Sequence, residues 1–189
     1  MIPKNRLEAL TDGVYAFAMT LLVIDLRLPE AFSPKTGEQL LNALSELSGQ
    51  LLVYAISFWV LGLRWLGQVR IDNHREKVTH GYAAWSLLGL FLVTCMPFST
   101  MIVGRYGHLA PAVWLYAANM AASSLVALRL QQLDAPQLSA AERADQRDPA
   151  LTTIASALIS VAISFVSPNY AMLGYLANLA PLRLMRRGR

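Results

Sequence analysis

The ionisable residues nearest the N-terminus gather where an apolar segment begins. Arg6, Glu8 and Asp12 precede a run that carries no further charge before Asp25. The positive end of a helix favours a carboxylate in its first turn, and a Thr or Asp side chain there can cap the unpaired amides. Thr11 and Asp12 are therefore predicted to cap a helix. In a second interpretation, Arg6 reaches Asp12 or a neighbouring helix and locks the inner end of that helix.

The apolar run that follows places selected residues on one helix face. Counting by threes and fours from Gly13 brings Phe17, Thr20 and Ile24 onto the same side. This stripe is apolar apart from one hydroxyl group. Periodicity alone favours ordinary helix packing, with the Thr20 hydroxyl bonded to the carbonyl of Ala16.

The remaining polar residues do not form a catalytic set. Cys95 is the single cysteine, so it forms no internal disulfide and no cysteine-based zinc site on its own. His74 and His80 are too far apart for an i, i+4 pair, so we expect interfacial polar residues there. The apolar segments hold no Ser–His pair, paired carboxylates or metal-ligand set. The sequence thus predicts no enzyme, no catalytic residue, no metal and no cofactor.

The composition indicates that the helices carrying these residues lie in a lipid bilayer. The 189 residues are 55% hydrophobic and 15% charged, whereas soluble domains carry roughly a quarter charged residues. A spanning helix needs about 20 mostly apolar residues. Six segments qualify, at 13–28, 51–66, 82–103, 109–128, 150–166 and 170–184. The sequence predicts an all-α integral membrane protein with one domain, residues 1–189, of six transmembrane helices.

The basic residues predict the orientation of these helices. Of the 16 Lys and Arg residues, 13 fall on one side and three on the other. The three are Arg27, Lys35 and Arg105. Since loops rich in Lys and Arg stay in the cytoplasm, both termini and the polar loop 131–149 are predicted to be cytoplasmic, in a cell (inner) membrane. The membrane topology thereby accounts for the distribution of the Lys and Arg residues, and no nucleic-acid partner is predicted.

Cleavage of the N-terminal segment is the alternative to an uncleaved first helix. Lys4 and Arg6 resemble the basic part of a signal peptide, and Ala16-Phe17-Ala18 resembles a cleavage site. The apolar run continues past that site to Ile24, which favours an uncleaved first helix.

The first helix resembles that of a known family. Segments 6–14 and 16–25, together with Trp65 and the stretch 96–100, look like the transmembrane protein 175 family of endosomal and lysosomal potassium channels and their bacterial homologues. The family signature is Arg-x-x-x-Phe-Ser-Asp. Arg6 and Asp12 match it, while Leu10 stands in place of the Phe and Thr11 in place of the Ser.

The resemblance implies a function and an assembly. Bacterial members are homotetramers of six-helix subunits, and the first helix of each subunit lines a central pore with apolar rings and a threonine layer. Carried over, the rings fall on Phe17, Thr20 and Ile24, with Leu21 bordering the pore. Arg6, Leu10, Thr11 and Asp12 become the signature network at the cytoplasmic end. The implied function is passive, potassium-permeable conduction, with further copies of the chain, membrane lipid and potassium ions as partners.

Two alternatives remain open. Phe17 stands where the family usually has Leu or Ile, so one alternative is a non-conducting membrane scaffold of the same fold, sealed by Phe17. A small-solute or proton-coupled transporter is the alternative from another class. Such transporters tend to show internal repeats and buried ionisable groups. The interiors of the second, third, fifth and sixth segments hold no acidic residue, which argues against proton coupling.

Overall fold

The chain folds almost entirely into helices. The computed structural model describes residues 2–28, 32–69, 77–134 and 140–179. The α-helices are α1 (Lys4–Leu21), α2 (Gly37–Glu46), α3 (Ser48–Val69), α4 (His80–Thr94), α5 (Met96–Tyr106), α6 (Ala110–Asp134) and α7 (Ala140–Ser164). Two 3₁₀ segments accompany them, η1 (Leu22–Asp25) and η3 (Pro168–Leu179). Two short strands, β1 (Ile2–Pro3) and β2 (Lys77–Val78), pair antiparallel and join the N-terminus to the start of α4.

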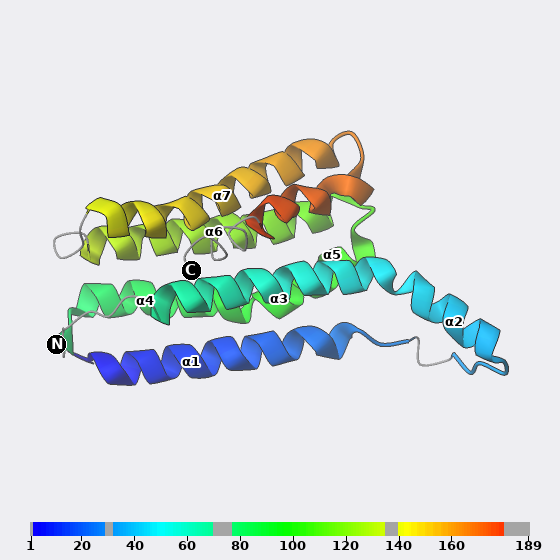
Figure 1. Cartoon of the computed structure of the whole chain (residues 1–189), viewed down its shortest axis with the longest axis horizontal. Coiled ribbons are helices and arrows are strands. Elements are labelled where there is room, and N and C mark those ends of the chain that lie inside the picture. Colours follow the sequence, from blue (N-terminus) through cyan, green and yellow to red (C-terminus); the bar gives the residue numbers. More distant parts are fainter. Residues whose placement is uncertain (1, 29–31, 70–76, 135–139, 180–189) are drawn as a thin grey trace, which may run out of the picture.

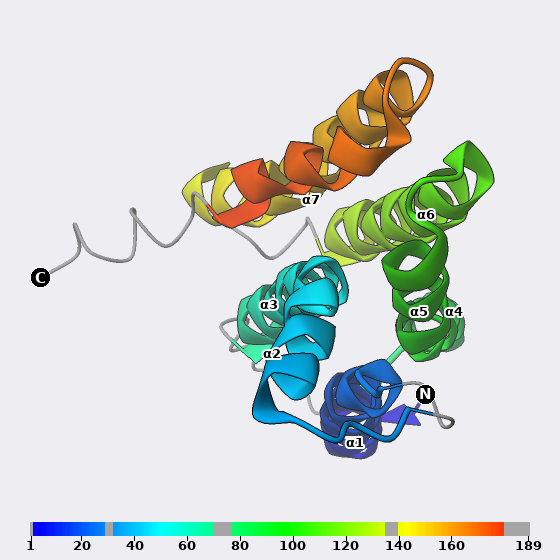
Figure 2. The ribbon, with the colours of Figure 1, turned by 90° about the vertical axis from the view of Figure 1, so that its right-hand side faces the viewer.

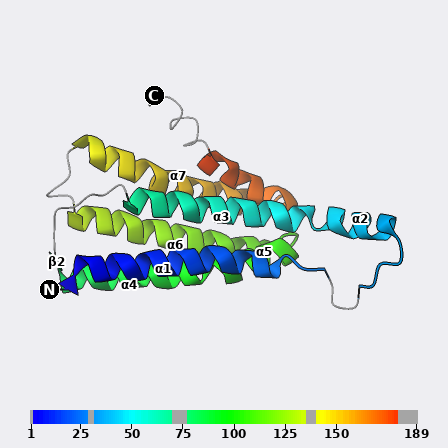
Figure 3. The same cartoon turned by 60° about the horizontal axis from the view of Figure 1, so that its bottom comes forward.

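The long helices run back and forth along one axis (Figure 1). Viewed end on, α1 lies at one edge of the bundle, between α3 and the α4–α5 pair (Figure 2). Helix α6 lies between α7 and the α4–α5 pair, and α7 lies at the edge opposite α1. Helix α2 extends beyond the end of the bundle, nearly in line with α3 (Figure 3). Among the described elements of a single chain, α1 therefore has neighbours on one side only.

The core forms around α6. Val113, Tyr116 and Met120 have no exposed surface, and the Tyr116 ring meets the edge of Tyr175 at 5.2 Å between centroids. Aromatic pairs in this edge-to-face geometry are favourable beyond the area they bury. These contacts fix α6 against η3 on the side away from α1.

Hydroxyl groups join three helices inside this core. The Ser57 and Tyr116 hydroxyls lie 3.0 Å apart, and the Thr100 hydroxyl donates to Ser57 Oγ at 3.0 Å. Asn119 donates from α6 to Ser99 Oγ of α5 at 3.2 Å. In an apolar solvent an unpaired polar group is costly, so interhelical hydrogen bonds of this kind hold spanning helices together.

Within the described ranges, four helical segments are long and apolar enough to cross a membrane. They are Lys4–Asp25, Ser48–Gln68, His80–Tyr106 and Ala110–Leu133, and Pro149–Ser164 is a shorter apolar helix. They contain most of the first five predicted segments. The fold is that of an all-α, multi-pass membrane protein, as the sequence predicts. The count of six spans remains a prediction.

Several predicted boundaries are wrong. Helix α1 begins at Lys4 rather than at Gly13, and the predicted loop 131–149 contains the end of α6 and the start of α7. Hydropathy locates apolar stretches, whereas these helices continue into the polar sequence that flanks them. The sixth segment, 170–184, is a 3₁₀ helix up to Leu179, and its remaining residues lie outside the described part of the chain, as does His74.

Candidate functional site

The two faces of α1 have opposite environments. Tyr15, Ala18 and Leu22 are at most 4% exposed, because they pack against the bundle. On the other side Phe17 is 66% exposed and Ile24 is 60% exposed. The bundle covers one face of this apolar helix and leaves the other uncovered along its whole apolar length.

The uncovered face coincides with the stripe expected from helical spacing. Its exposed members are Leu10, Gly13, Phe17, Thr20 and Ile24. Leu21 is half-buried beside them. Leu21 lines a groove between α1 and the end of α4. The residues that line this groove are Ala9, Leu10, Gly13, Val14, Phe17, Ala18, Leu21 and Thr94. An apolar stripe with a groove at its side is suited to pack against another apolar helix.

Thr20 supplies the one hydroxyl group in the middle of this stripe. Its Oγ1 donates to the carbonyl of Phe17 at 2.8 Å, so the expected bond to Ala16 is wrong. Both the i−3 and i−4 carbonyls lie within reach of a helical threonine, and α1 tightens into the 3₁₀ turn η1 just beyond this point. Because the hydroxyl donates inward, its oxygen keeps lone pairs that can accept or coordinate on the exposed side.

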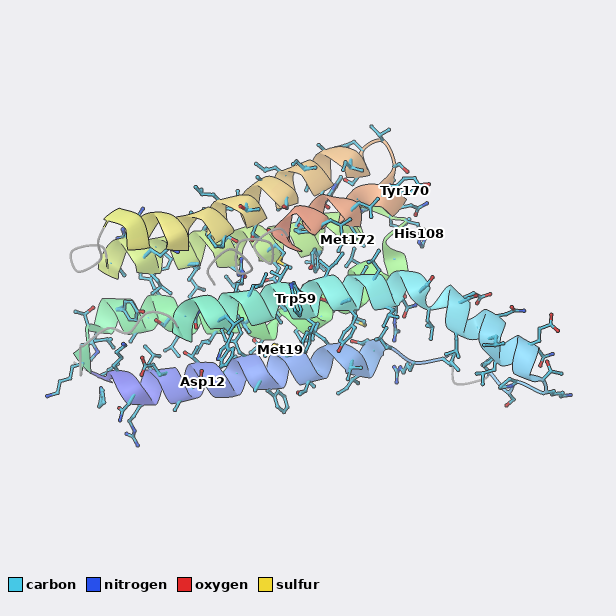
Figure 4. The ribbon with its side chains drawn as sticks, viewed as in Figure 1. Asp12, Met19, Trp59, His108, Tyr170 and Met172 are labelled. Carbon is cyan, nitrogen blue, oxygen red and sulfur yellow. The ribbon has the colours of Figure 1, made fainter. Side chains whose placement is uncertain are left out.

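Asp12 joins α1 to α3 near the opposite end of the helix. Asp12 lies on the part of α1 that precedes Met19 (Figure 4), and its Oδ1 accepts from Trp65 Nε1 at 2.8 Å. Trp65 is half-buried and Asp12 is exposed, and the bond gives the indole N–H a partner on another helix. The Asp12–Trp65 bond thereby fixes α1 against the end of α3.

The predicted cap at Thr11 and Asp12 is wrong. The helix begins at Lys4, so both residues lie about two turns inside it. The Thr11 hydroxyl donates to the carbonyl of Leu7 at 2.8 Å, and the N-cap residue Pro3 has no side-chain cap. Lys4, Arg6 and Glu8 do not stop α1, because Arg6 and Glu8 are exposed on the surface of the helix and Lys4 pairs with Glu8.

Arg6 does not reach Asp12 in the structure. Six residues of helix separate them by about 240° around the axis, so their side chains point to different sides. Asp12 pairs with Trp65, and Lys4 Nζ pairs with Glu8 Oε1 at 3.1 Å. Arg6 and Leu10 are both exposed, on the uncovered side of α1. Within the described ranges, Asp12 is the one signature residue that hydrogen-bonds to a side chain of another helix.

Sequence reasoning overlooked a second polar contact set at this end. Arg64 on α3 donates to the Met120 carbonyl of α6 at 3.3 Å and also to Ser124 Oγ. One turn further, Gln68 donates to the Tyr15 hydroxyl at 3.3 Å. A lone arginine inside an otherwise apolar span is the signal that could have identified it, since such a group needs protein partners. Arg64 ties α3 to α6, as Asp12 ties α1 to α3.

Comparisons with known proteins agree with this geometry. The model of the family described as "Endosomal/lysosomal potassium channel TMEM175" matches residues 6–97. A potassium channel of Streptomyces collinus is 31% identical over 131 residues, which cover 66% of this chain and 61% of that relative. A potassium channel of Chamaesiphon minutus is 29% identical over 187 residues, covering 88% and 92%. The chain spans less than two thirds of the Streptomyces protein and 21% of the rat endosomal/lysosomal proton channel TMEM175.

Two solved structures share the fold. The crystal structure of a lysosomal potassium-selective channel TMEM175 homolog from Chamaesiphon minutus has a TM-score of 0.79 at 29% identity, covering 95% of this chain and 96% of that one. A variant of the potassium channel MtTMEM175, solved with a Nanobody-MBP fusion protein, has a TM-score of 0.60 at 15% identity, which shows the fold alone.

The fold defines a multi-pass α-helical membrane protein in which one face of α1 is left uncovered. The family match over residues 6–97 and the Chamaesiphon structure show that the chain is similar to proteins of the TMEM175 family. The description of that family is of an ion channel and not of an enzyme.

Proposed function

We propose that the protein is a potassium-permeable channel that conducts cations passively through a central pore lined by α1. The observation that carries the proposal is the uncovered apolar face of α1. Phe17 and Ile24 are 66% and 60% exposed in a span that is otherwise packed against α3 and α4. The names of the two bacterial relatives, both potassium channels, support potassium as the ion.

Assembly follows from the same face. One helix cannot enclose a pore, so several copies of α1 must surround a common axis. We infer a homotetramer, each subunit a six-helix membrane domain, in line with the closed symmetry of most homo-oligomers. The neighbouring subunit packs into the apolar groove that α1 forms with Thr94 of α4. Membrane lipid covers the remaining outward faces.

Each residue of the stripe has a distinct role in this pore. Four copies of Phe17 and four of Ile24 form dry rings that oppose an ion, because the ion sheds water there without replacement ligands. Four copies of Thr20 place hydroxyl oxygens between the rings, where they replace part of the hydration shell. Leu21 borders the pore. Arg6, Leu10, Thr11 and Asp12 form the signature motif at the cytoplasmic end of α1, and Asp12 holds that end against α3.

Ion flux through purified protein tests the proposal. Liposomes containing the protein should take up potassium above the rate of protein-free liposomes, and sodium more slowly. Thr20→Val keeps the side-chain shape and removes the hydroxyl, so it should bring the potassium and sodium rates closer together without loss of the assembled protein. Absence of flux for both ions would favour a non-conducting scaffold sealed by Phe17. Flux of a small solute instead would favour a transporter.

The orientation gives a second prediction. The N-terminus, the start of α4 and the start of α7 lie at the same end of the bundle (Figure 1), and the sequence puts 13 of 16 basic residues on that side. We therefore expect this end to face the cytoplasm of the cell, with both chain termini inside. Reporter fusions before residue 1 and after Arg189 should both give a cytoplasmic signal. A periplasmic signal from either fusion would contradict six spans.

A further inference from the structure

The outer end of α1 has a different backbone from the rest of the helix. After Leu21 the chain tightens into η1, in which successive side chains point about 120° apart. Leu22 is 2% exposed and packs inside the bundle, whereas Ile24 is 60% exposed on the outer stripe. The rotation of this one turn therefore decides where the Ile24 side chain points.

An ion pair joins this turn to another helix. Asp25 Oδ1 lies 3.7 Å from Arg105 Nη2, and each side chain is about one-third exposed (32% and 34%). Arg105 is in the last turn of α5, where the negative helix end also favours a cation. The Lys4–Glu8 pair, in contrast, joins two residues of α1 itself.

The surroundings of the pair restrict its movement. A small pocket between η1, α3 and α5 contains both side chains, and Gln50, Tyr54 and Thr100 contribute to its wall. Partial shielding from water makes such a pair stronger than a fully exposed one. Since α5 also carries Thr100, which is hydrogen-bonded to Ser57 in the core, the pair connects η1 to a firmly packed helix.

We propose that Asp25 and Arg105 are positioning residues that fix the rotation of η1 against α5 and thereby hold the Ile24 ring at the outer end of the pore. This inference rests on the proposed function, in which α1 lines the pore. Neither residue is an ion ligand in this role. Releasing the pair lets η1 turn, and the adjacent Ile24 side chain leaves its place in the ring.

Charge exchange tests the proposal. Asp25→Asn and Arg105→Gln should each raise potassium flux in liposomes about fivefold, the size of effect that a partly exposed ion pair can carry. The exchanged variant Asp25→Arg/Arg105→Asp restores the pair and should return flux toward the wild-type rate. Lys35→Gln removes another positive charge from an exposed position on the outer side and should leave flux unchanged.

Two flux results would overturn the proposal. If the pair acted only through the potential at the pore mouth, Asp25→Asn would lower flux, Arg105→Gln would raise it, and the exchange would restore neither. Wild-type flux in both single variants would show that the pair positions nothing.

A labelling experiment tests the positioning role of Asp25 and Arg105 without a measurement of ion flux. In a Cys95→Ala background, which removes the only native cysteine, Ile24→Cys should react with a water-soluble thiol reagent at a defined rate. Arg105→Gln should change that rate about fivefold, and the charge exchange should restore it. An unchanged rate would overturn the positioning role. A changed rate in a protein that conducts no ions would sustain the positioning role and refute the channel.

Discussion

Phe17→Ala is expected to raise potassium flux through the reconstituted protein about tenfold, which corresponds to a barrier lower by about 1.4 kcal/mol. Phe17 is the most exposed large hydrophobic side chain of α1, at 66%. Four phenyl rings at one level form the narrowest apolar ring of the proposed pore, and a dry ring opposes ions that must lose their water. Truncation widens the ring and admits water, so discrimination between potassium and sodium should weaken as flux rises.

A matched control separates pore lining from general exposure. Leu158 on α7 is 67% exposed, almost the same as Phe17, but α7 lies at the edge of the bundle opposite α1 (Figure 2). Leu158→Ala should leave flux unchanged. Phe58→Ala on α3 reports packing, since the Phe58 ring contacts Tyr54 at 6.0 Å between centroids. If Phe17→Ala only destabilises the protein as Phe58→Ala does, with flux unchanged, α1 does not line the pore with this face.

Asp12→Ala is expected to reduce the tetramer recovered in mild detergent about tenfold. The change removes the acceptor for Trp65 Nε1, which lies 2.8 Å from the carboxylate. A hydrogen bond of this kind contributes about 0.5–1.5 kcal/mol, so its loss loosens the contact of α1 with α3. A displaced α1 presents its uncovered face in the wrong place for neighbouring subunits. Size-exclusion chromatography with light scattering measures the tetramer fraction.

Two further variants test whether the loss of tetramer in Asp12→Ala comes from the Asp12–Trp65 bond. Trp65→Phe removes the donor of the same bond and should lower the tetramer fraction in the same direction. Glu8→Ala removes a carboxylate from the same helix that is 56% exposed and pairs with Lys4 at 3.1 Å within α1, so it should have little effect. Equal, negligible losses for Asp12→Ala and Glu8→Ala would mean that the Asp12–Trp65 bond does not hold the assembly. A monomer for the unmodified protein in several detergents would refute the tetramer itself.

Helix boundaries show where sequence reasoning stops. The predicted first segment starts at Gly13, but α1 starts at Lys4, because a helix continues as long as its backbone bonds are satisfied, whatever the polarity of its side chains. Helix α2 lies in a predicted outer loop, capped by Thr36, whose hydroxyl oxygen accepts from the Gln39 amide at 3.2 Å. A hydropathy scan has no access to either feature, since both are set by hydrogen bonds.

The site was partly predictable for a related reason. Helical spacing alone places Phe17, Thr20 and Ile24 on one face, and the structure leaves that face exposed. Spacing cannot tell whether a face is buried or exposed, however. That depends on the bundle, which covers the Tyr15–Ala18–Leu22 side with α3, α4 and α5.

The sequence by itself determined the solvent of this protein, its apolar segments and the separation of basic residues between its two ends. These are local properties, because the transfer of a side chain into lipid depends on its own chemistry. The tertiary structure decided which groups meet. Asp12 and Trp65 are 53 residues apart, and Asp25 reaches Arg105 on another helix. Such pairs depend on helix rotation and packing, which are fixed only when all the helices are assembled together.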